Sequence, residues 1–208
     1  MLRSLVGSEM CIRDRSRGGG TYPAADWAVY HEAMGASLSL TLNGSSTAAG
    51  PFTNPGTVWY NTAPTSTHFY VGNLNETNGD NNYVAYCFAE VEGYSKFDSY
   101  TGNGNADGPF VYCGFKPRWI MTRAYTRGSE WVIWDTARNP YNLAELSLQA
   151  QSASNEASVS FYDIDILSNG FKVRTAYSTH NQSSESYLFV AFAENPFGGD
   201  GVSPATAR

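Results

Sequence analysis

The sequence has few cysteines, few cations and no long apolar run, and each shortage excludes a class of protein. Three cysteines in 208 residues, without a Cys-x-x-Cys spacing, are too few for a disulfide framework. No apolar run approaches the roughly 20 residues that span a bilayer, so we expect no membrane insertion. Stretches rich in Ala, Leu, Glu and Lys, which build helices, are also scarce. The sequence therefore excludes a disulfide-stapled scaffold and a helical membrane protein.

Residues 1–18 need separate treatment because they bias the composition. The run LVGSEMCIRD, residues 5–14, is similar to the translation of a transposase adapter used in preparing sequencing libraries. A signal peptide is the alternative, but this run contains Glu9 and lacks an apolar core of about 7 to 15 residues. We therefore interpret residues 1–18 as an adapter-derived, non-native segment.

The rest of the chain is acidic. The 13 Lys+Arg and 19 Asp+Glu of the whole chain include four arginines and two acids from residues 1–18. This leaves 9 basic and 17 acidic residues, a balance of −8. Such a surface repels phosphate backbones, and no Lys/Arg cluster offsets it. We therefore expect no nucleic-acid partner.

The residues present in excess are those of strands and turns. Phe, Trp and Tyr make up 14% of the chain, and it contains 20 glycines. Candidate strands recur at short spacing with Gly/Asn turn signals between them, which is typical of an all-β sandwich or barrel. We predict strands at 27–31, 38–42, 58–61, 67–71, 83–91, 110–115, 118–124, 131–135, 143–148, 158–165, 171–176 and 187–194.

Two stretches of the chain repeat each other. YVAYCFAE at 83–90 returns as YLFVAFAE at 187–194, and the same offset of 104 residues pairs Trp27 with Trp131. About 100 residues is the usual size of one small β-sandwich. We therefore predict two tandem antiparallel β-sandwich repeats, the first truncated at its N-terminus where the adapter-derived segment begins. The predicted bounds are 19–97 for the first repeat, 98–197 for the second and 198–208 for a flexible C-terminal tail.

The repeated strand contains residues that suggest an active site. Cys87 and Tyr86 of the first copy become Ala191 and Val190 in the second. A catalytic mechanism shared by both copies would therefore lack its reactive side chains in the second copy. Side chains alternate along a strand, and both faces of this strand are largely apolar. The pattern favours packing, and it predicts a central strand that is covered on both sides.

The other candidates for chemistry do not form a recognisable motif. There is no Gly-x-Ser-x-Gly elbow and no phosphate-binding loop. A glycanase needs two carboxylates at a defined distance, and Glu90, Glu194 or the pair Asp163 and Asp165 are the candidates. Strand-end hydrogen bonds and a solvated strand face are the simpler interpretations. We expect no enzyme and no catalytic residue, because no zinc-ligand pair occurs among His31, His68 and His180 either.

One loop is a candidate for calcium. NGNADG places the oxygen-bearing side chains of Asn103, Asn105 and Asp107 at alternate positions, as at the start of an EF-hand loop. The twelfth position is Gly114, where such a loop needs a bidentate Glu. A plain Gly/Asn turn is the favoured interpretation, and we expect no other cofactor.

Aromatic residues are the remaining binding candidates, because sugar rings stack on the faces of Trp and Tyr. Trp59, Tyr60, Trp131 and Trp134 are the best placed of these residues. A position in the core is nevertheless the favoured interpretation for each tryptophan, since large aromatic side chains in strands are commonly buried.

A resemblance rests on six segments of the chain: PTSTHFYVG, YVAYCFAEVEGYSKFDSYTGNG, GPFVYCGFKPRWIM, WVIWDTARNPYN, ILSNGFKVRT and AFAENPFGG. These segments resemble structural proteins of tailed phages, particularly marine ones, in which tandem lectin-like β-sandwiches form tail or fibre components. The resemblance runs from about Trp27 to the C-terminus. It implies a jelly-roll or concanavalin A-like fold, synthesis in the host cytoplasm, and assembly into the virion as a homo-oligomer with other tail proteins. Host-surface glycans are the implied ligands. The alternative is a carbohydrate-binding module of a secreted enzyme.

Overall fold

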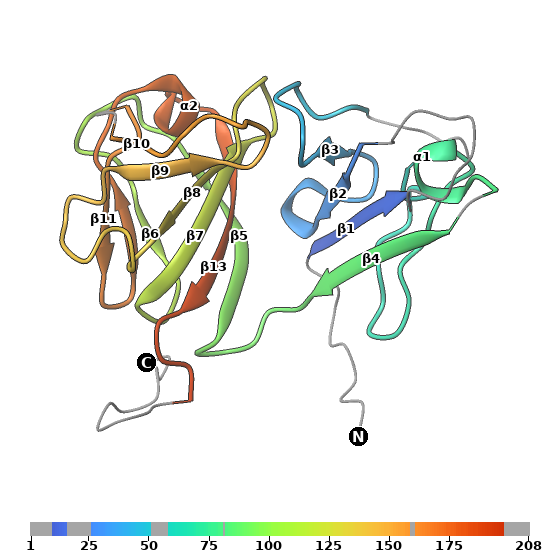
Figure 1. Cartoon of the computed structure of the whole chain (residues 1–208), viewed down its shortest axis with the longest axis horizontal. Coiled ribbons are helices and arrows are strands. Elements are labelled where there is room, and N and C mark those ends of the chain that lie inside the picture. Colours follow the sequence, from blue (N-terminus) through green and yellow to red (C-terminus); the bar gives the residue numbers. More distant parts are fainter. Residues whose placement is uncertain (1–9, 16–25, 51–57, 81, 159–160, 198–208) are drawn as a thin grey trace. The chain divides into compact units, whose positions relative to one another are not determined.

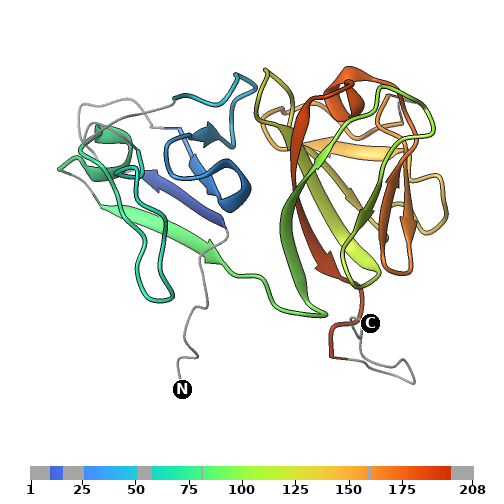
Figure 2. The same ribbon diagram turned by 180° about the vertical axis from the view of Figure 1, so that it is seen from behind.

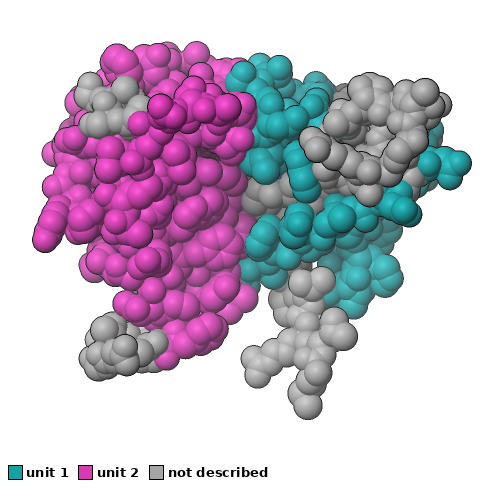
Figure 3. Space-filling model, viewed as in Figure 1, with its two compact units in different colours: residues 1–90 teal, residues 91–208 magenta. Residues whose placement is uncertain are grey.

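The structure is a computed structural model of the chain, drawn from two sides in Figures 1 and 2. It describes residues 10–15, 26–50, 58–80, 82–158 and 161–197. The chain divides into two compact units, residues 1–90 (unit 1) and 91–208 (unit 2), which Figure 3 colours separately. Residues 91–97, which the sequence analysis gives to the first repeat, therefore belong to unit 2.

Unit 1 is built on one antiparallel sheet with the strand order β3-β2-β1-β4. A single turn of 3-10 helix follows β2, and a short helix, α1, precedes β4. The strands are β1 (Met10–Arg15), β2 (Ala28–His31), β3 (Leu40–Thr41) and β4 (Tyr83–Phe88), and the helices are η1 (Glu32–Met34) and α1 (Asn75–Asn78).

Part of the N-terminal segment that the sequence analysis sets aside is a strand in this sheet. β1 lies between β2 and β4 and is antiparallel to both. The exclusion of residues 1–18 from the fold is therefore wrong for Met10–Arg15. Any alternating backbone can complete a ladder, because strand pairing uses main-chain groups. The adapter origin of residues 1–18 stays a prediction.

Unit 2 contains two antiparallel sheets that enclose a core. The six-stranded sheet has the order β10-β9-β8-β7-β13-β5 and the three-stranded sheet the order β11-β12-β6. A short helix, α2 (Ser178–Asn181), precedes the last strand. The strands are β5 (Ser95–Thr101), β6 (Phe110–Tyr112), β7 (Pro117–Ala124), β8 (Val132–Asp135), β9 (Leu146–Gln149), β10 (Ala157–Ser158), β11 (Ile164–Leu167), β12 (Gly170–Val173) and β13 (Ser186–Ala193).

The predicted all-β class is confirmed. All strand pairs are antiparallel, and the described α-helices are two single turns of four residues each. None of the helices in the described part of the chain is long and apolar enough to cross a membrane.

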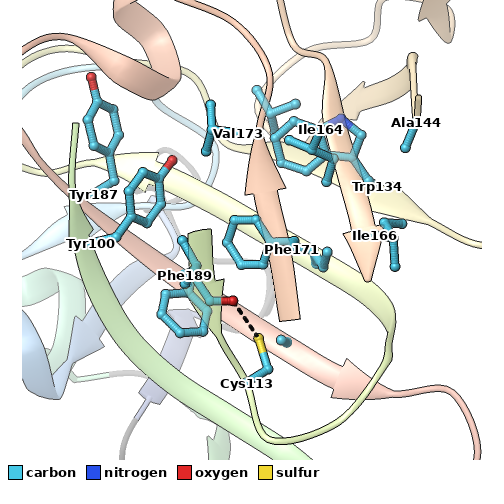
Figure 4. Close-up of a cluster of buried hydrophobic side chains, with 14 of the residues drawn as sticks. Tyr100, Cys113, Trp134, Ala144, Ile164, Ile166, Phe171, Val173, Tyr187 and Phe189 are labelled. Carbon is cyan, nitrogen blue, oxygen red and sulfur yellow. Dashed lines mark hydrogen bonds between the residues drawn. The ribbon is translucent and has the colours of Figure 1, made fainter. Parts of the chain in front are cut away.

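The core of unit 2 joins residues from both of its sheets (Figure 4). Tyr100 and Tyr187 stack with ring centroids 5.1 Å apart, and Phe171 meets Phe189 edge-on at 5.6 Å. Aromatic pairs in these geometries are worth about 0.5–1.5 kcal/mol beyond the apolar area that they bury. Part of the aromatic richness of the sequence therefore goes into packing this core. The cluster also contains Cys113, Trp134, Ala144, Ile164, Ile166 and Val173.

The offset of 104 residues recurs in the strand register. In unit 1, Cys11 of β1 lies opposite Tyr30 of β2 and Cys87 of β4. In unit 2, Ile120 of β7 lies opposite Trp134 of β8 and Ala191 of β13. Trp134 is 104 residues after Tyr30, and Ala191 is 104 residues after Cys87, so Ile120 takes the place of Cys11. The two units thus share one arrangement of strands, β3-β2-β1-β4 matching β9-β8-β7-β13.

The repeated tyrosine has the same structural role in both units. The Tyr83 hydroxyl accepts a hydrogen bond from the N–H of Gly79, just after α1, at 2.6 Å. The Tyr187 hydroxyl accepts one from the N–H of Gln182, just after α2, at 2.8 Å. It also donates to the carbonyl of Ser178 at 2.6 Å. The phenol therefore ties a helix to the strand that follows it.

The prediction of a central strand holds for β13 and is wrong for β4. β13 pairs with β7 on one side and β5 on the other, and residues on both of its faces are buried. β4 pairs with β1 alone and is an edge strand in the described part of the sheet. Val84 and Tyr86 are accordingly 48% and 52% exposed. The physical reason is that unit 1 has no described strand in the place that β5 takes in unit 2.

Two predicted strands, 58–61 and 67–71, are loops. Tyr60 and Asn61 have φ values of 54° and 45°, so the chain turns there. Val58 and Trp59 are nonetheless buried, in a cluster with Ala28 and Tyr30. The apolar run that predicts a strand at 58–61 therefore reflects core packing in a turn.

Candidate functional site

The three tryptophans that the sequence analysis proposes for ligand binding are buried. Trp59 lies edge-on to Tyr30 in unit 1, with ring centroids 6.0 Å apart. Trp134 lies in the core of unit 2, and its Nε1 donates to the carbonyl of Tyr162 at 3.0 Å. Trp131 is covered by the guanidinium carbon of Arg123, 5.0 Å from its ring centroid. The core position that the sequence analysis favours for each tryptophan is confirmed, and burial removes the ring faces from solvent.

Tyr60, the fourth aromatic candidate, is exposed. It lies in the turn after Trp59, and its carbonyl accepts a hydrogen bond from the hydroxyl of Thr62 at 3.1 Å. Its candidate partner Trp59 is buried. Tyr60 therefore exposes its own ring to solvent, but the neighbouring ring of Trp59 is not available beside it for ligand binding.

The asparagine oxygens of the candidate calcium loop, for which the sequence analysis favours a plain Gly/Asn turn, accept hydrogen bonds from the loop's own main chain. Asn103 Oδ1 accepts from the N–H of Asn105, and Asn105 Oδ1 accepts from the N–H of Asp107, both at 2.9 Å. The carboxylate of Asp107 lies 2.7 Å from Lys172 Nζ. The hydrogen bond and charge of Lys172 lower the pKa of Asp107. The described residues contain no group of three or more His, Cys, Asp or Glu that could hold a metal.

The side chain of Asn181 holds the loop 103–108 through several hydrogen bonds. The Asn181 Oδ1 accepts from the N–H of Asn103 at 2.7 Å, and its Nδ2 lies 2.9 Å from Asn103 Oδ1. The same Nδ2 lies 2.6 Å from the carbonyl of Asn105 and 2.8 Å from that of Thr175. Asn181 is fully buried at the end of α2. The loop 103–108 is therefore a side-chain-clamped turn.

We expect calcium to leave the stability of the protein unchanged. The loop oxygens accept main-chain hydrogen bonds, and an ion would have to displace those donors and Lys172. The measurement is the thermal unfolding midpoint with millimolar calcium and with a chelator. A rise in midpoint with calcium that Asp107→Asn abolishes would contradict this expectation.

The carboxylates proposed for glycan cleavage lie in separate surroundings. Glu194 is held by Lys116 Nζ at 2.7 Å and by the hydroxyl of Thr136 at 3.3 Å. Asp165 lies 3.4 Å from Arg174 Nε. Asp163 has a buried Oδ1 without a hydrogen-bond partner, and burial followed by the charge of Glu145 raises its pKa.

The two thiols do not form a reactive pair. Cys113 is buried, and its Sγ lies 3.9 Å from the carbonyl of Val111 (Figure 4). Burial raises the pKa of this thiol to about 12. A raised pKa disfavours the reactive thiolate at neutral pH. Cys87 lies in unit 1 and Cys113 in unit 2, both as free thiols. The interpretation of Cys113 as a packing residue therefore agrees with its surroundings.

Unit 2 exposes a pair of stacked aromatic rings that sequence reasoning misses. Phe161 and Tyr177 are 50% and 43% exposed, and their ring centroids lie 4.6 Å apart with an interplanar angle of 27°. Tyr162 lies edge-on to Tyr177 at 6.3 Å. Tyr177 is the N-cap residue of α2, while the other two precede β11. The three rings come from segments that the fold brings together.

Polar groups adjoin these rings. Gln149 Nε2, at the end of β9, donates to the hydroxyl of Tyr162 at 3.1 Å. Glu130 Oε2 accepts from the hydroxyl of Thr179 at 3.4 Å. Burial, and then the negative charge of Glu130, raise the pKa of Tyr162. We call Phe161, Tyr162, Tyr177, Gln149 and Glu130 the aromatic patch.

The aromatic patch combines two chemistries on one surface. Its exposed rings offer apolar faces on which a flat ligand can stack. Gln149 and Glu130, which bind the hydroxyls of Tyr162 and Thr179, add an amide and a carboxylate to the patch. Such a combination suits a ligand that has both apolar C–H faces and hydroxyl groups. A sugar ring is a ligand of that kind.

Comparison with known proteins places the chain in a family. The sequence profile described as "Domain of unknown function (DUF7483)" matches residues 7–196. The chain belongs to the DUF7483 family. The DUF7483 match extends over both units and includes β1, although its description names no activity. The comparisons with curated proteins and with solved structures gave no match.

Sequence reasoning misses the aromatic patch for a physical reason. Phe161 and Tyr162 fall in the predicted strand 158–165, where an apolar residue is expected in the core. Tyr177 directly follows the predicted strand 171–176 and carries no motif. The available signal is weak, namely a local excess of aromatic residues on both sides of one Asn-Gly turn.

Proposed function

We propose that the protein is a structural component of a phage virion, a part of a tail fibre or other tail appendage, and that it contributes to attachment on host surfaces. The observation that carries the attachment role is the exposed, stacked pair Phe161 and Tyr177, with an amide and a carboxylate beside it. The virion role is supported by the sequence resemblance to tail and fibre proteins.

The proposed architecture is a tandem array of two lectin-like β-sandwiches of the jelly-roll or concanavalin A type. It is supported by the register that recurs after 104 residues and by the two sheets around one core in unit 2. An appendage built in this way acts through multivalency, because linked weak sites give firm binding together. Homo-oligomerisation and other tail proteins as partners belong to this proposal.

Tyr177→Ala is expected to weaken binding to the recognised glycan. The change removes one of the two exposed ring faces, and we expect a loss of at least about tenfold in affinity, roughly 1.4 kcal/mol. The measurement is binding of the purified chain to an array of bacterial surface polysaccharides and to host envelopes. No binding by the unmodified chain, with both units folded, would contradict the attachment role.

Tyr141→Ala is the matched control for this experiment. Tyr141 is 84% exposed, and no aromatic ring stacks on it in the described part of the chain. Its removal tests whether any surface tyrosine supports binding. We expect unchanged affinity, whereas an equal loss in both variants would show that the aromatic patch is not the binding site.

The second candidate function is a carbohydrate-binding module of a secreted enzyme, and the aromatic patch favours it equally. The two functions differ in what is encoded around the domain. An adapter-free sequence read across the gene separates them. Neighbouring tail, baseplate or capsid genes support the virion role, while a signal peptide and a hydrolase domain in the same frame support the module.

A further inference from the structure

The helix α2 is buried although it consists entirely of polar residues. Its sequence is STHN, and Thr179, His180 and Asn181 are buried in unit 2. The hydrophobic effect is proportional to the apolar area removed from water, so it contributes little to the burial of such a turn. Hydrogen bonds must therefore hold α2 in its place.

The hydrogen bonds of α2 come from side chains of its neighbours and from its own last residue. The hydroxyls of Tyr187, Tyr100 and Ser129 donate to three of its carbonyls, at 2.6, 2.9 and 3.2 Å. Asn181 joins the turn to the loop 103–108. All of these bonds can break without separating the strands of either sheet. Such an element can open locally while the rest of its unit stays folded.

His180 is the residue of α2 that titrates, and its surroundings suit only its neutral form. Its Nδ1 lies 3.1 Å from the hydroxyl of Thr122 on β7, and its Nε2 has no hydrogen-bond partner. The rings of Trp134 and Tyr162 lie 5.1 and 5.0 Å from the imidazole. A protonated imidazole carries a charge and an N–H on both nitrogens. A buried charge without a paired acceptor is strongly unfavourable, so protonation disfavours the closed position of α2.

The ionisable groups around α2 do not offset this cost. Glu130 is the carboxylate that contacts α2, and it accepts from the hydroxyl of a threonine and not from the imidazole. β7 contributes a cation, Arg123, which cannot pair with an imidazolium. Burial raises the pKa of each phenol near the turn, so these groups stay neutral in acid. These phenols, from β5, the segment before β11 and β13, are Tyr100, Tyr162 and Tyr187.

We propose that α2 is a pH-dependent switch, in which protonation of His180 opens this turn while both sheets of unit 2 stay folded. Tyr177 is the N-cap residue of α2, so the open state loses its stacking on Phe161. Asn181 is the last residue of α2, so the open state also releases the loop 103–108. Acid therefore changes the aromatic patch and this loop together. The consequence for attachment rests on the proposed function, whereas the opening of α2 does not.

The pKa of His180 in the two states determines how strongly the opening depends on pH. Burial lowers this pKa to about 3 in the closed state, and the open state has the ordinary value of 6.5. The open state therefore binds a proton that the closed state does not, and acid favours opening. Between pH 7 and pH 5 we expect the equilibrium constant for opening to rise about 25-fold.

The test is hydrogen exchange of single amides in the full chain, followed by NMR. The N–H of Asn181 donates to the carbonyl of Tyr177 at 2.9 Å and that of Gln182 to the hydroxyl of Tyr187 at 2.8 Å, so their exchange reports opening of α2. The N–H of Ala144, which donates to a core carbonyl at 2.8 Å, reports unfolding of the unit. After correction for intrinsic exchange rates, we expect the two α2 amides to exchange faster than Ala144 at every pH and to show the 25-fold rise in opening.

Low concentrations of urea separate local opening from unfolding of the unit, because the effect of urea grows with the surface that is exposed. We expect urea to accelerate the exchange of Ala144 and to leave the α2 amides nearly unchanged. Equal opening free energies and equal urea dependence for α2 and Ala144 would overturn the proposal, since His180 would then titrate only when the whole unit unfolds. Opening of α2 that does not change between pH 7 and pH 5 would also overturn it. Both comparisons use the unmodified chain.

Two histidine variants assign the effect to one group. His180→Gln removes the titrating group, and we expect the opening of α2 to become independent of pH over the same range. His68→Gln is the matched control, because His68 is exposed in unit 1, and it should keep the 25-fold rise. A pH dependence that persists in a folded His180→Gln variant would show that another group operates the switch and would overturn the role of His180.

Discussion

Asn181→Ala is expected to destabilise unit 2 by about 3 to 5 kcal/mol. The change leaves the N–H of Asn103 and the carbonyl of Thr175 without the side chain that pairs with them. An unsatisfied buried polar group costs about 1–3 kcal/mol, and the amide contact to the carbonyl of Asn105 is lost as well. All of these contacts come from the side chain of one residue, Asn181 of α2, so a single substitution removes them together.

Urea unfolding measures this effect. In a background with Trp27→Phe and Trp59→Phe, the fluorescence reports on unit 2, because the remaining tryptophans, Trp119, Trp131 and Trp134, all lie there. Asn155→Ala is the matched control, because Asn155 is exposed and surface substitutions usually change stability by less than about 0.5 kcal/mol. A loss below about 1 kcal/mol in Asn181→Ala would show that the loop 103–108 is held by other contacts.

Acid is expected to destabilise unit 2 through His180 as the pH falls below 6.5. His180 is buried, its Nε2 has no hydrogen-bond partner, and its Nδ1 lies 3.1 Å from the hydroxyl of Thr122. The rings of Trp134 and Tyr162 lie 5.1 and 5.0 Å from the imidazole. This apolar burial lowers the pKa of His180 from 6.5 to about 3.

The direction of this pH dependence of stability follows from proton binding in the folded and unfolded states. Between pH 6.5 and about 3 the unfolded chain binds a proton at His180 that the folded chain does not, so stability falls as the pH falls. The loss approaches roughly 5 kcal/mol at the lower end of this range. Above pH 6.5 the group is neutral in both states and has no effect. Asp107 and Asp135 have pKa values below 3.8, so their contribution is lost at lower pH than the first part of the histidine effect.

The measurement is the free energy of unfolding of unit 2 from pH 7 to pH 4.5. His180→Gln removes the titrating group, and we expect its stability to be nearly constant over this range. His68→Gln, at an exposed position of unit 1, keeps the wild-type profile because His180 is still present. An unchanged slope in His180→Gln would show that another group causes the acid sensitivity.

The sequence predicts the fold where the pattern of side chains is determined by local backbone geometry. Alternating apolar residues and Gly/Asn turns place β7, β8 and β13 within two residues of their observed ends. The repeated offset of 104 residues correctly relates strands whose registers the structure shows to match. β5 is missed because its sequence, SKFDSYT, is polar and breaks the apolar alternation at an edge.

The sites are harder to predict, because exposure is a tertiary property. The burial of Trp59, Trp131 and Trp134 depends on what covers each ring, which periodicity does not encode. Phe161 and Tyr177 meet only after the chain has folded β11 and β12 back on each other. The Asn103 loop shows the same limit, since its clamp comes from Asn181, 78 residues away in the sequence.

The neighbouring positions of β5 and β13 determine how unit 2 responds to mechanical load. The chain enters the unit through β5 and leaves through β13, and Ser95 at the entry lies opposite Phe192 at the exit. A pull on the two flanking segments therefore separates the strands from one end. Hydrogen bonds perpendicular to the strands then break one after another instead of sharing the force. Unit 2 would therefore unfold at low force, and the chain would lengthen gradually as successive hydrogen bonds between β5 and β13 break.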